Sequence, residues 1–417
     1  MQLHKRLSLE QVKAILAGYG EGKVSGVEAL DLLGVKRAVF FELVKRYRKD
    51  PGAFSIEYHR KSPRRIGDEE EKKIKQALWE DRRLVENPKI PVWSYNYSAV
   101  RDRLLKKEDV SVSVPTLIER AKRYGCYKPQ KERRIHDRQV LTTAIGGLVQ
   151  HDASHHLWSP YAQEKWVLIT SLDDYSRTLL YAEFAESEST WAHIEAVRSV
   201  VGQSGVPLRY YVDSLRIFRF VSEGGSIWEE QNLKTDDVNP QWKRCVELAG
   251  AKVIYALSPQ AKGKIERPYR WLQDRIVRTC ALEKISRIKE GREVLRAEVE
   301  RYNHHQVHST TLEVPSIRFA RARKEGATLF RPFLVPKPYT HIDDIFCLQE
   351  TRTTDGYRKI SLWNQVIAVP KVDPYEDVEI HIIPNRRDDT IGIRIWCEGR
   401  LVLVTTFPRT TLPKVRF

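Results

Sequence analysis

The sequence is poor in residues that could cross-link the chain or hold a structural metal. It has five cysteines in 417 residues, and none lies close to another. No C-x-x-C pair occurs, which argues against a zinc ribbon, and the wide spacing gives no disulfide framework. We therefore expect buried, reduced thiols and a cytoplasmic protein.

Long apolar runs are missing as well. No segment reaches the roughly 18 apolar residues that a membrane-spanning helix needs. Residues 1–20 show neither a long apolar core nor a signal-type cleavage site. We expect no membrane partner. The chain also lacks a long internal repeat and low-complexity tracts.

Acidic residues are outnumbered by basic ones. The chain holds 71 Lys and Arg against 55 Asp and Glu, a formal charge of +16. Residues 1–140 contribute +12 of this, from 32 basic and 20 acidic residues. Such an excess indicates a polyanionic partner, and its position favours the first third of the chain as the contact region. The length predicts roughly three domains.

The first 50 residues read as three short helices. The segment SGVEALDLLG ends a helix at Gly34, and a basic helix follows it. Two short helices across a glycine fit a helix-turn-helix, whose second helix can enter the DNA major groove. We expect a DNA-binding domain over 1–50, although small basic helical bundles can also have this pattern. Its candidate DNA contacts are Lys36, Arg37, Lys45 and Arg46.

A second helical unit is predicted over 68–126, after a linker at 51–67. Its last helix begins with Ser113 as N-cap and Pro115 in the first turn. Arg120 and Arg123 fall on its outer face and are further candidate DNA contacts. A second helix-turn-helix fits this pattern, and 127–144 reads as a basic linker.

The pattern changes at about residue 145. Three strand-like runs are followed by helix, strand, helix, strand and helix, which predicts an α/β layer with a mixed sheet over 145–325. Residues 335–417 show several short strands. Hairpin signals at Asp355-Gly356 and Glu398-Gly399 suggest a small antiparallel β-barrel. The predicted fold class is multidomain α+β.

Three acids stand where the sheet would place a ligand. Alternation in LVQHDAS puts Asp152 on one face of a central strand, Asp213 ends the fourth strand, and Glu266 is at or just before the last helix. Converging carboxylates suit Mg²⁺ or Mn²⁺, and two such ions can activate an attacking oxygen and stabilise a leaving one.

Structural duties compete with that interpretation. An aspartate at a strand end is often a turn residue or a helix cap. Asp173 and Asp174 lie where two strands would reverse, so we expect them to hold a turn. His304 and His308 have a zinc-like spacing, but YNHHQVHST lacks a glutamate base and nearby cysteines.

The segment SPQAKGKIER is where the chain resembles a known family. With LITSLDDYSR and YVDSLRIFRF it is similar to the DDE transposases and retroviral integrases, in particular bacterial insertion-sequence transposases with an integrase-type core. The resemblance implies a ribonuclease H-like core in which Asp152, Asp213 and Glu266 bind two metal ions. The second and third acids are 53 residues apart, more than is usual in the family. The insertion EGGSIWEEQNLKTDDVNPQ accounts for the excess.

The resemblance also implies an activity and partners. A metal-activated water would nick the element end, and the freed 3′-hydroxyl would attack target DNA. The helical units would read terminal inverted repeats, and a multimer would form on DNA. Residue spacing along the last helix, and not the resemblance, predicts a basic stripe that includes Trp271 and Arg278 and suits a DNA backbone, although a solvated helix face would have the same pattern. The candidate DNA contacts of this helix, with those just before it, are Lys262, Lys264, Arg267 and Arg275.

Two other functions fit the same residues. One is a non-catalytic DNA-binding regulator derived from a transposase. The other is a ribonuclease H-like nuclease that cuts without joining strands.

Overall fold

The computed structural model describes residues 7–56, 66–129, 142–212, 240–255, 266–386 and 388–411. At Pro240 and at residues 266–268 it describes the backbone alone. The chain divides into two compact units, Met1–Glu71 and Lys72–Phe417. No helix among the described residues has both the length and the apolar character that crossing a membrane requires.

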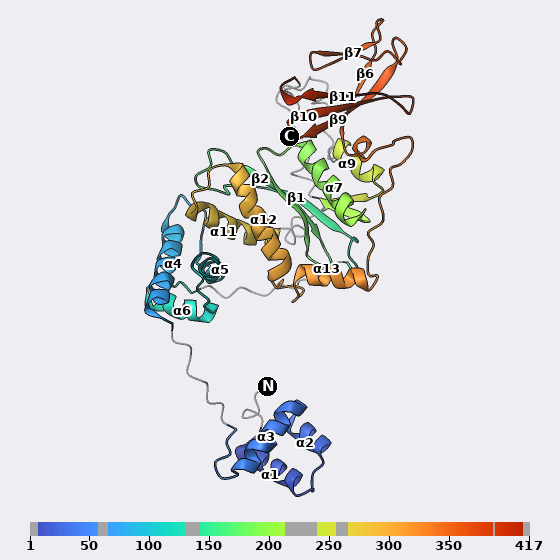
Figure 1. The fold of residues 1–417 in the computed structure, drawn as a ribbon. Coiled ribbons are helices and arrows are strands. Elements are labelled where there is room, and N and C mark those ends of the chain that lie inside the picture. The colour runs from blue at the N-terminus through green and yellow to red at the C-terminus, as the bar shows by residue number, and fades with distance from the viewer. Residues whose placement is uncertain are drawn as a thin grey trace. The chain divides into compact units, whose positions relative to one another are not determined.

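The smaller unit is built from α1 (Leu9–Gly20), α2 (Gly26–Leu33) and α3 (Arg37–Lys49) (Figure 1). Ser8 and Ser25 start the first two helices with reciprocal capping boxes, which satisfy backbone N–H groups that lack a helical partner. Gly34 then ends α2 in the left-handed conformation. The three predicted helices are confirmed. Their assignment as a DNA-binding helix-turn-helix stays a prediction.

The larger unit begins with α4 (Asp68–Glu86), α5 (Tyr97–Glu108) and α6 (Val114–Arg123). The predicted N-cap is confirmed, since the Ser113 hydroxyl accepts a hydrogen bond from the amide of Thr116 at 3.2 Å. Apolar side chains around the end of α4 pack against α11 (Glu266–Leu282) of the central domain. They are Leu84, Ile90 and Val92, with Val277 and Ala281 opposite.

A mixed five-stranded sheet forms the centre of this unit, in the order β3-β2-β1-β4-β5. β1 to β3 are antiparallel neighbours, and β4 and β5 run parallel to β1. Helices α7 and α9 cover one face, and α11 and α12 cover the other (Figure 1). The predicted element order is confirmed. The bounds are β1 (Val149–His156), β2 (Trp166–Asp173), β3 (Leu179–Ala185), α7 (Thr190–Ser204), β4 (Arg209–Val212), α9 (Pro240–Leu248), β5 (Lys252–Tyr255), α11 (Glu266–Leu282), α12 (Ile288–His305) and α13 (Pro315–Lys324).

The C-terminal strands form an open sheet, β11-β10-β9-β6, and a separate pair, β7-β8. The described residues form no closed barrel, so the predicted barrel is not confirmed. The turn at Glu398-Gly399 does join two paired strands, β10 and β11, as predicted. The bounds are η2 (Ile342–Asp344), β6 (Leu348–Thr353), β7 (Lys359–Leu362), β8 (Gln365–Ala368), β9 (Asp377–Asn385), β10 (Thr390–Cys397), β11 (Arg400–Pro408) and η3 (Arg409–Thr411).

The hairpin predicted at Asp355-Gly356 is wrong. β6 pairs with β9 instead of β7, and β7 pairs with β8 around Trp363 and Asn364. Both residues of that tight turn have positive φ, at 48° and 67°, which matches the twist of a two-residue hairpin. Asp355 still makes a local turn, since its carbonyl accepts a hydrogen bond from the amide of Arg358.

Candidate active site on the central strand

Asp152 lies in the middle of β1, opposite Thr170 of β2. Its side chain is 3% exposed and shares a strand face with Gln150 and Ser154, as alternation predicted. This face is the one covered by α11. The carboxylate is therefore held in the interior, between the sheet and α11.

The first turn of α11 is held against this part of the sheet. The hydroxyl of Tyr269 lies 2.7 Å from Oγ1 of Thr170, and Nε2 of Gln273 donates to Oγ of Ser154 at 3.4 Å. Burial raises the pKa of the Tyr269 phenol, and the nearby charge of Asp152 raises it further. Both contacts place the start of α11 beside Asp152.

The other two predicted acids are Asp213 and Glu266, and the structure describes neither side chain. Asp213 lies outside the described residues, directly after Val212 at the end of β4. β4 runs parallel to β1, with Tyr211 opposite Gln150. Glu266 is the first residue of α11, and its side chain is not described. The described elements that lead to these two acids therefore both lie beside β1.

Asp173 and Asp174 hold the β2-β3 turn, as predicted. Asp173 accepts hydrogen bonds from the amides of Gly146 and Ser176, at 2.9 and 2.8 Å. Asp174 accepts one from the side-chain amide of Gln150 at 2.7 Å. Burial raises the pKa of the Asp173 carboxyl. Through these hydrogen bonds both carboxylates stabilise the turn and its contacts with neighbouring backbone and side-chain groups.

A buried chain of imidazoles behind Asp152 was missed in the sequence. Nδ1 of His151 lies 2.9 Å from Oγ of Ser171, and its Nε2 lies 2.9 Å from Nδ1 of His193. His193 contacts Glu188 at 3.1 Å, and Glu188 also pairs with His155. Alternation in HDASHH already put His151 and His155 on one face. Only the fold brings His193 and Glu188 to them.

The surroundings of these side chains disfavour a charge on the His151 imidazole and favour one on the Glu188 carboxylate. Burial, and then the neighbouring His193, hold the pKa of His151 well below its ordinary value. Burial would raise the pKa of the Glu188 carboxyl, but hydrogen bonds from His155 and His193 outweigh it and lower the pKa to about 2. The ring of Trp242 stacks on His151 with centroids 5.5 Å apart.

Comparison with known sequences gives two informative relatives. The protein y4bF of Sinorhizobium fredii, which carries the name of a transposase, is 27% identical over 270 residues, 64% of this chain and 54% of its own. The transposase for insertion sequence IS1202 of Streptococcus pneumoniae is 26% identical over 182 residues, 44% of this chain and 37% of its own. The chain is therefore similar in sequence to transposases. The matched regions span about half the length of the first relative and 37% of the second. No family model matches the chain.

Solved structures give weaker matches. The HTLV-2 integrase catalytic core domain in complex with magnesium is 14% identical, with a TM-score of 0.28 over 42% of this chain and 98% of that one. A chain of the simian T-cell lymphotropic virus intasome in complex with PP2A regulatory subunit B56 gamma is 12% identical, with a TM-score of 0.29 over 75% of this chain and 95% of that one. TM-scores this low say nothing about the architecture of this chain.

The basic stripe predicted along α11 is wrong beyond Trp271. Arg275 is only 4% exposed and is bound between Asp102 of α5, at 2.8 Å, and Glu298 of α12, at 2.7 Å. Arg278 is buried as well, against Asp81 and Asp274. Since α4, α5 and α12 cover this side of α11, neither guanidinium is available to DNA in this arrangement.

The other candidate DNA contacts have mixed positions. Lys262 and Lys264 lie outside the described residues, and the side chain of Arg267 is not described. Arg120 is largely covered and bonds to Glu119 at 2.9 Å, while Arg123 is exposed. In the smaller unit the four candidates are exposed on or beside α3, and one of them, Arg46, also donates to the carbonyl of Ser55 at 3.0 Å. Those four are Lys36, Arg37, Lys45 and Arg46.

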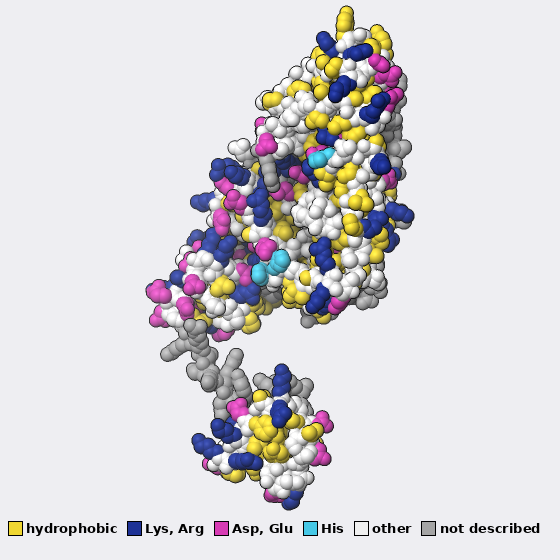
Figure 2. All heavy atoms as spheres, turned by 45° about the vertical axis from the view of Figure 1, so that its right-hand side comes forward, with side chains coloured by type: hydrophobic (Ala, Val, Ile, Leu, Met, Phe, Trp, Pro, Cys, Tyr) yellow, Lys and Arg dark blue, Asp and Glu magenta, His cyan; other side chains and the backbone are white. Residues whose placement is uncertain are grey.

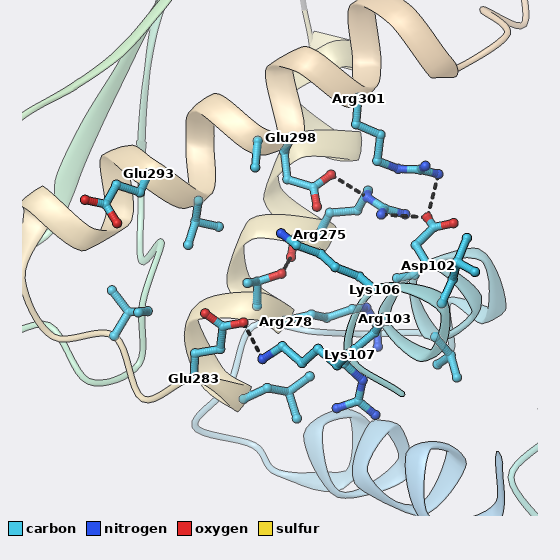
Figure 3. A pocket seen from close by; sticks show the side chains of 18 of the residues that line it. Asp102, Arg103, Lys106, Lys107, Arg275, Arg278, Glu283, Glu293, Glu298 and Arg301 are labelled. Carbon is cyan, nitrogen blue, oxygen red and sulfur yellow. Dashed lines mark hydrogen bonds and ion pairs between the residues drawn. The ribbon is translucent and has the colours of Figure 1, made fainter. Parts of the chain in front are cut away.

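The buried arginines lie at a cleft of about 790 Å³ between α5 and the pair α11 and α12 (Figure 3). Asp102 projects into it and binds Arg275 and Arg301, the latter at 2.6 Å. Lys107 of α5 reaches Glu283 across the cleft at 2.6 Å. This ion network fastens the second helical unit to the central domain.

Proposed function

We propose that this chain is a DNA transposase with a ribonuclease H-like core, and that Asp152, Asp213 and Glu266 form its metal-binding site. The observation that carries the proposal is the position of Asp152. It is a buried carboxylate on the central strand, with the first turn of α11 packed beside it through Tyr269 and Thr170. The sequence similarity to transposases supports the same function.

The residues fit a hard divalent cation. Carboxylate oxygens are the donors that Mg²⁺ and Mn²⁺ prefer, and Asp152 presents one in a dry part of the sheet. Among the described residues no group of three potential ligands occurs, and two of the three proposed ligands have no described side chain. Two bound ions would supply a Lewis acid for the scissile phosphate and an activated oxygen nucleophile.

The protein contributes positioning and charge. Asp152 sits on a strand held on both sides by ladder bonds, so its carboxylate is preorganised before DNA arrives. Lys262, Lys264 and Arg267 flank Glu266 in sequence and would neutralise phosphates next to the scissile bond. The proposed reaction is hydrolysis of the phosphodiester at the 3′ end of the element, followed by attack of the freed 3′-hydroxyl on a target phosphodiester, which displaces a 3′-hydroxyl of the target strand.

DNA recognition is assigned to the helical units. Exposed cations on α3 of the smaller unit and Arg123 of α6 are suited to phosphates and base edges. Because two element ends must be joined, we expect a homo-oligomer on DNA. The C-terminal strands would bind DNA or a neighbouring subunit.

The decisive experiment is strand transfer by the purified chain. The substrates are duplexes with the sequences that flank the reading frame, incubated with a target plasmid and Mg²⁺. We expect joined products that disappear with EDTA, and Asp152→Asn should lower their rate by about two orders of magnitude or more. Glu164→Gln, at an exposed acid between β1 and β2, is the control and should leave the rate unchanged.

The product pattern separates the alternatives. Nicks without joined strands would favour the nuclease, and DNA binding without Mg²⁺-dependent chemistry would favour the regulator. Equal activity of the Asp152→Asn variant, with its melting temperature unchanged, would remove the proposed active site.

A further inference from the structure

A shallow hollow of about 400 Å³ lies on the outer face of α4. We call it the α4 hollow. One helix supplies all of its lining, so its shape depends on α4 alone. The lining residues are Lys72, Lys75, Gln76, Trp79, Glu80 and Arg83.

The α4 hollow is positively charged. Three of its six residues are cations, and its one acid, Glu80, is bound by Nη1 of Arg103 at 2.7 Å. Lys75 and Arg83 are exposed. On the visible face of the larger unit, by contrast, Figure 2 shows cations and acids intermingled. The lining of the hollow, with three cations and one paired acid, is more basic than such a mixture.

An exposed indole lies in the hollow. Trp79 is 45% exposed, and Nζ of Lys75 lies 4.7 Å from its ring centroid and 5.5 Å from that of Tyr124. Both distances are within the roughly 6 Å at which a cation is attracted to an aromatic face, and the indole adds a flat apolar surface. The exposed part of the indole is available to pack against a ligand that lies along α4.

The spacing of the cations suits a phosphodiester backbone. From Lys72 to Arg83 the helix rises roughly 16 Å at about 1.5 Å per residue. Phosphates of one DNA strand recur about every 3.4 Å along the duplex axis. A row of three cations over this length can therefore contact several phosphates of one strand.

The inner face of α4 makes the hollow rigid with respect to the central sheet. Asp81 points away from the hollow and is bound by Arg278 of α11. The turn after α4 adds apolar packing against the same helix. A ligand bound in the hollow would therefore lie at a fixed distance and orientation from Asp152, which lies beside the start of α11.

We propose that the α4 hollow binds the phosphate backbone of duplex DNA, and so holds a substrate in a set relation to the active site. This rests on the proposed transposase function, because DNA is the polyanion that such an enzyme must hold. Lys75 and Arg83 supply charge, and Trp79 packs against the sugar edge of the backbone.

The test is DNA binding by the full chain in EDTA, measured by fluorescence anisotropy of a labelled duplex over a series of salt concentrations. Removing two phosphate contacts by Lys75→Ala with Arg83→Ala should weaken binding and reduce the slope of log K against log salt by about 2. The matched control is Lys289→Ala with Arg296→Ala, two exposed cations of α12. It should leave both quantities unchanged.

Trp79→Ala should weaken binding severalfold without changing the salt slope, because the indole carries no charge, and Trp79→Phe should restore part of it. Wild-type affinity and slope in the Lys75/Arg83 variant would overturn the assignment. So would an equal loss in the α12 control, or a loss of self-association in place of DNA binding.

The outcome is separable from the proposed function. If strand transfer requires Asp152 but is unaffected by the Lys75/Arg83 double substitution, the proposal for the α4 hollow is rejected and the transposase function is kept. DNA binding that depends on the hollow, in a chain without Mg²⁺-dependent chemistry, keeps the hollow and removes the transposase.

Discussion

The hydroxyl of Tyr269 lies 2.7 Å from Oγ1 of Thr170, directly across the ladder from Asp152. This bond joins the first turn of α11, which carries Glu266, to the strand next to β1. Both side chains are buried, so water cannot replace either partner. The relationship makes Tyr269 a positioning residue for the proposed active site.

Tyr269→Phe should lower the free energy of unfolding by about 1 kcal/mol, because it removes one buried hydrogen bond. Thr170→Val removes the same bond from the other side, so chemical denaturation of the two single variants and the double variant should show a coupling of about 1 kcal/mol. Tyr357→Phe, at an exposed phenol, is the control. Additive losses would show that the two hydroxyls do not depend on each other.

The same variant should slow strand transfer. If Tyr269 positions α11, the rate of joining should fall while duplex binding in EDTA stays constant, since both hydroxyls are buried and cannot contact DNA themselves. If the Tyr269→Phe protein is less stable but joins DNA at the wild-type rate, the bond contributes to stability and does not position the active site.

Arg278→Met should be strongly destabilising. It leaves Asp81 buried without its partner, which costs about 3–5 kcal/mol for an interior ion pair. Adding Asp81→Leu should recover much of this loss. Arg287→Met, which breaks the exposed pair with Glu290, should cost less than about 1 kcal/mol. Thermal unfolding monitored by circular dichroism measures all three. A mild loss for Arg278→Met would mean that the second helical unit is not fastened through this residue.

Acid should weaken the fold through Glu188. The pKa of this carboxyl falls from an ordinary 4.5 to about 2 in the folded chain. A lowered folded pKa stabilises the protein above the unfolded value, and the stabilisation disappears as pH falls from 4.5 toward 2. Its size is on the order of 3 kcal/mol. Denaturant unfolding at a series of pH values should therefore show a steep decline for the wild type and a flatter one for Glu188→Gln.

Glu186→Gln controls for the removal of one acid nearby, because Glu186 is exposed. Its pH dependence should follow that of the wild type. An equally flat profile in both variants would assign the acid sensitivity to net charge and not to the bonds from His155 and His193.

Local patterns in the sequence determined much of the fold. Strand alternation placed Asp152 on the face that α11 covers, and Ser113 marked a helix start that the structure confirms. The Glu398-Gly399 turn joined neighbouring strands as expected. Such features depend on the conformations of a few consecutive residues, so the chain carries them locally. The resemblance to transposases was also legible in short motifs.

Only the tertiary structure decided what those elements contact. Arg275 and Arg278 looked like an exposed basic stripe, but α4, α5 and α12 bring carboxylates to them and bury the charges. β6 pairs with β9, far along the chain, and not with β7. The bond between His151 and His193 likewise joins residues 42 positions apart. Periodicity shows which face of an element is apolar or charged, but a partner is chosen by packing over long sequence separations, which no local pattern records.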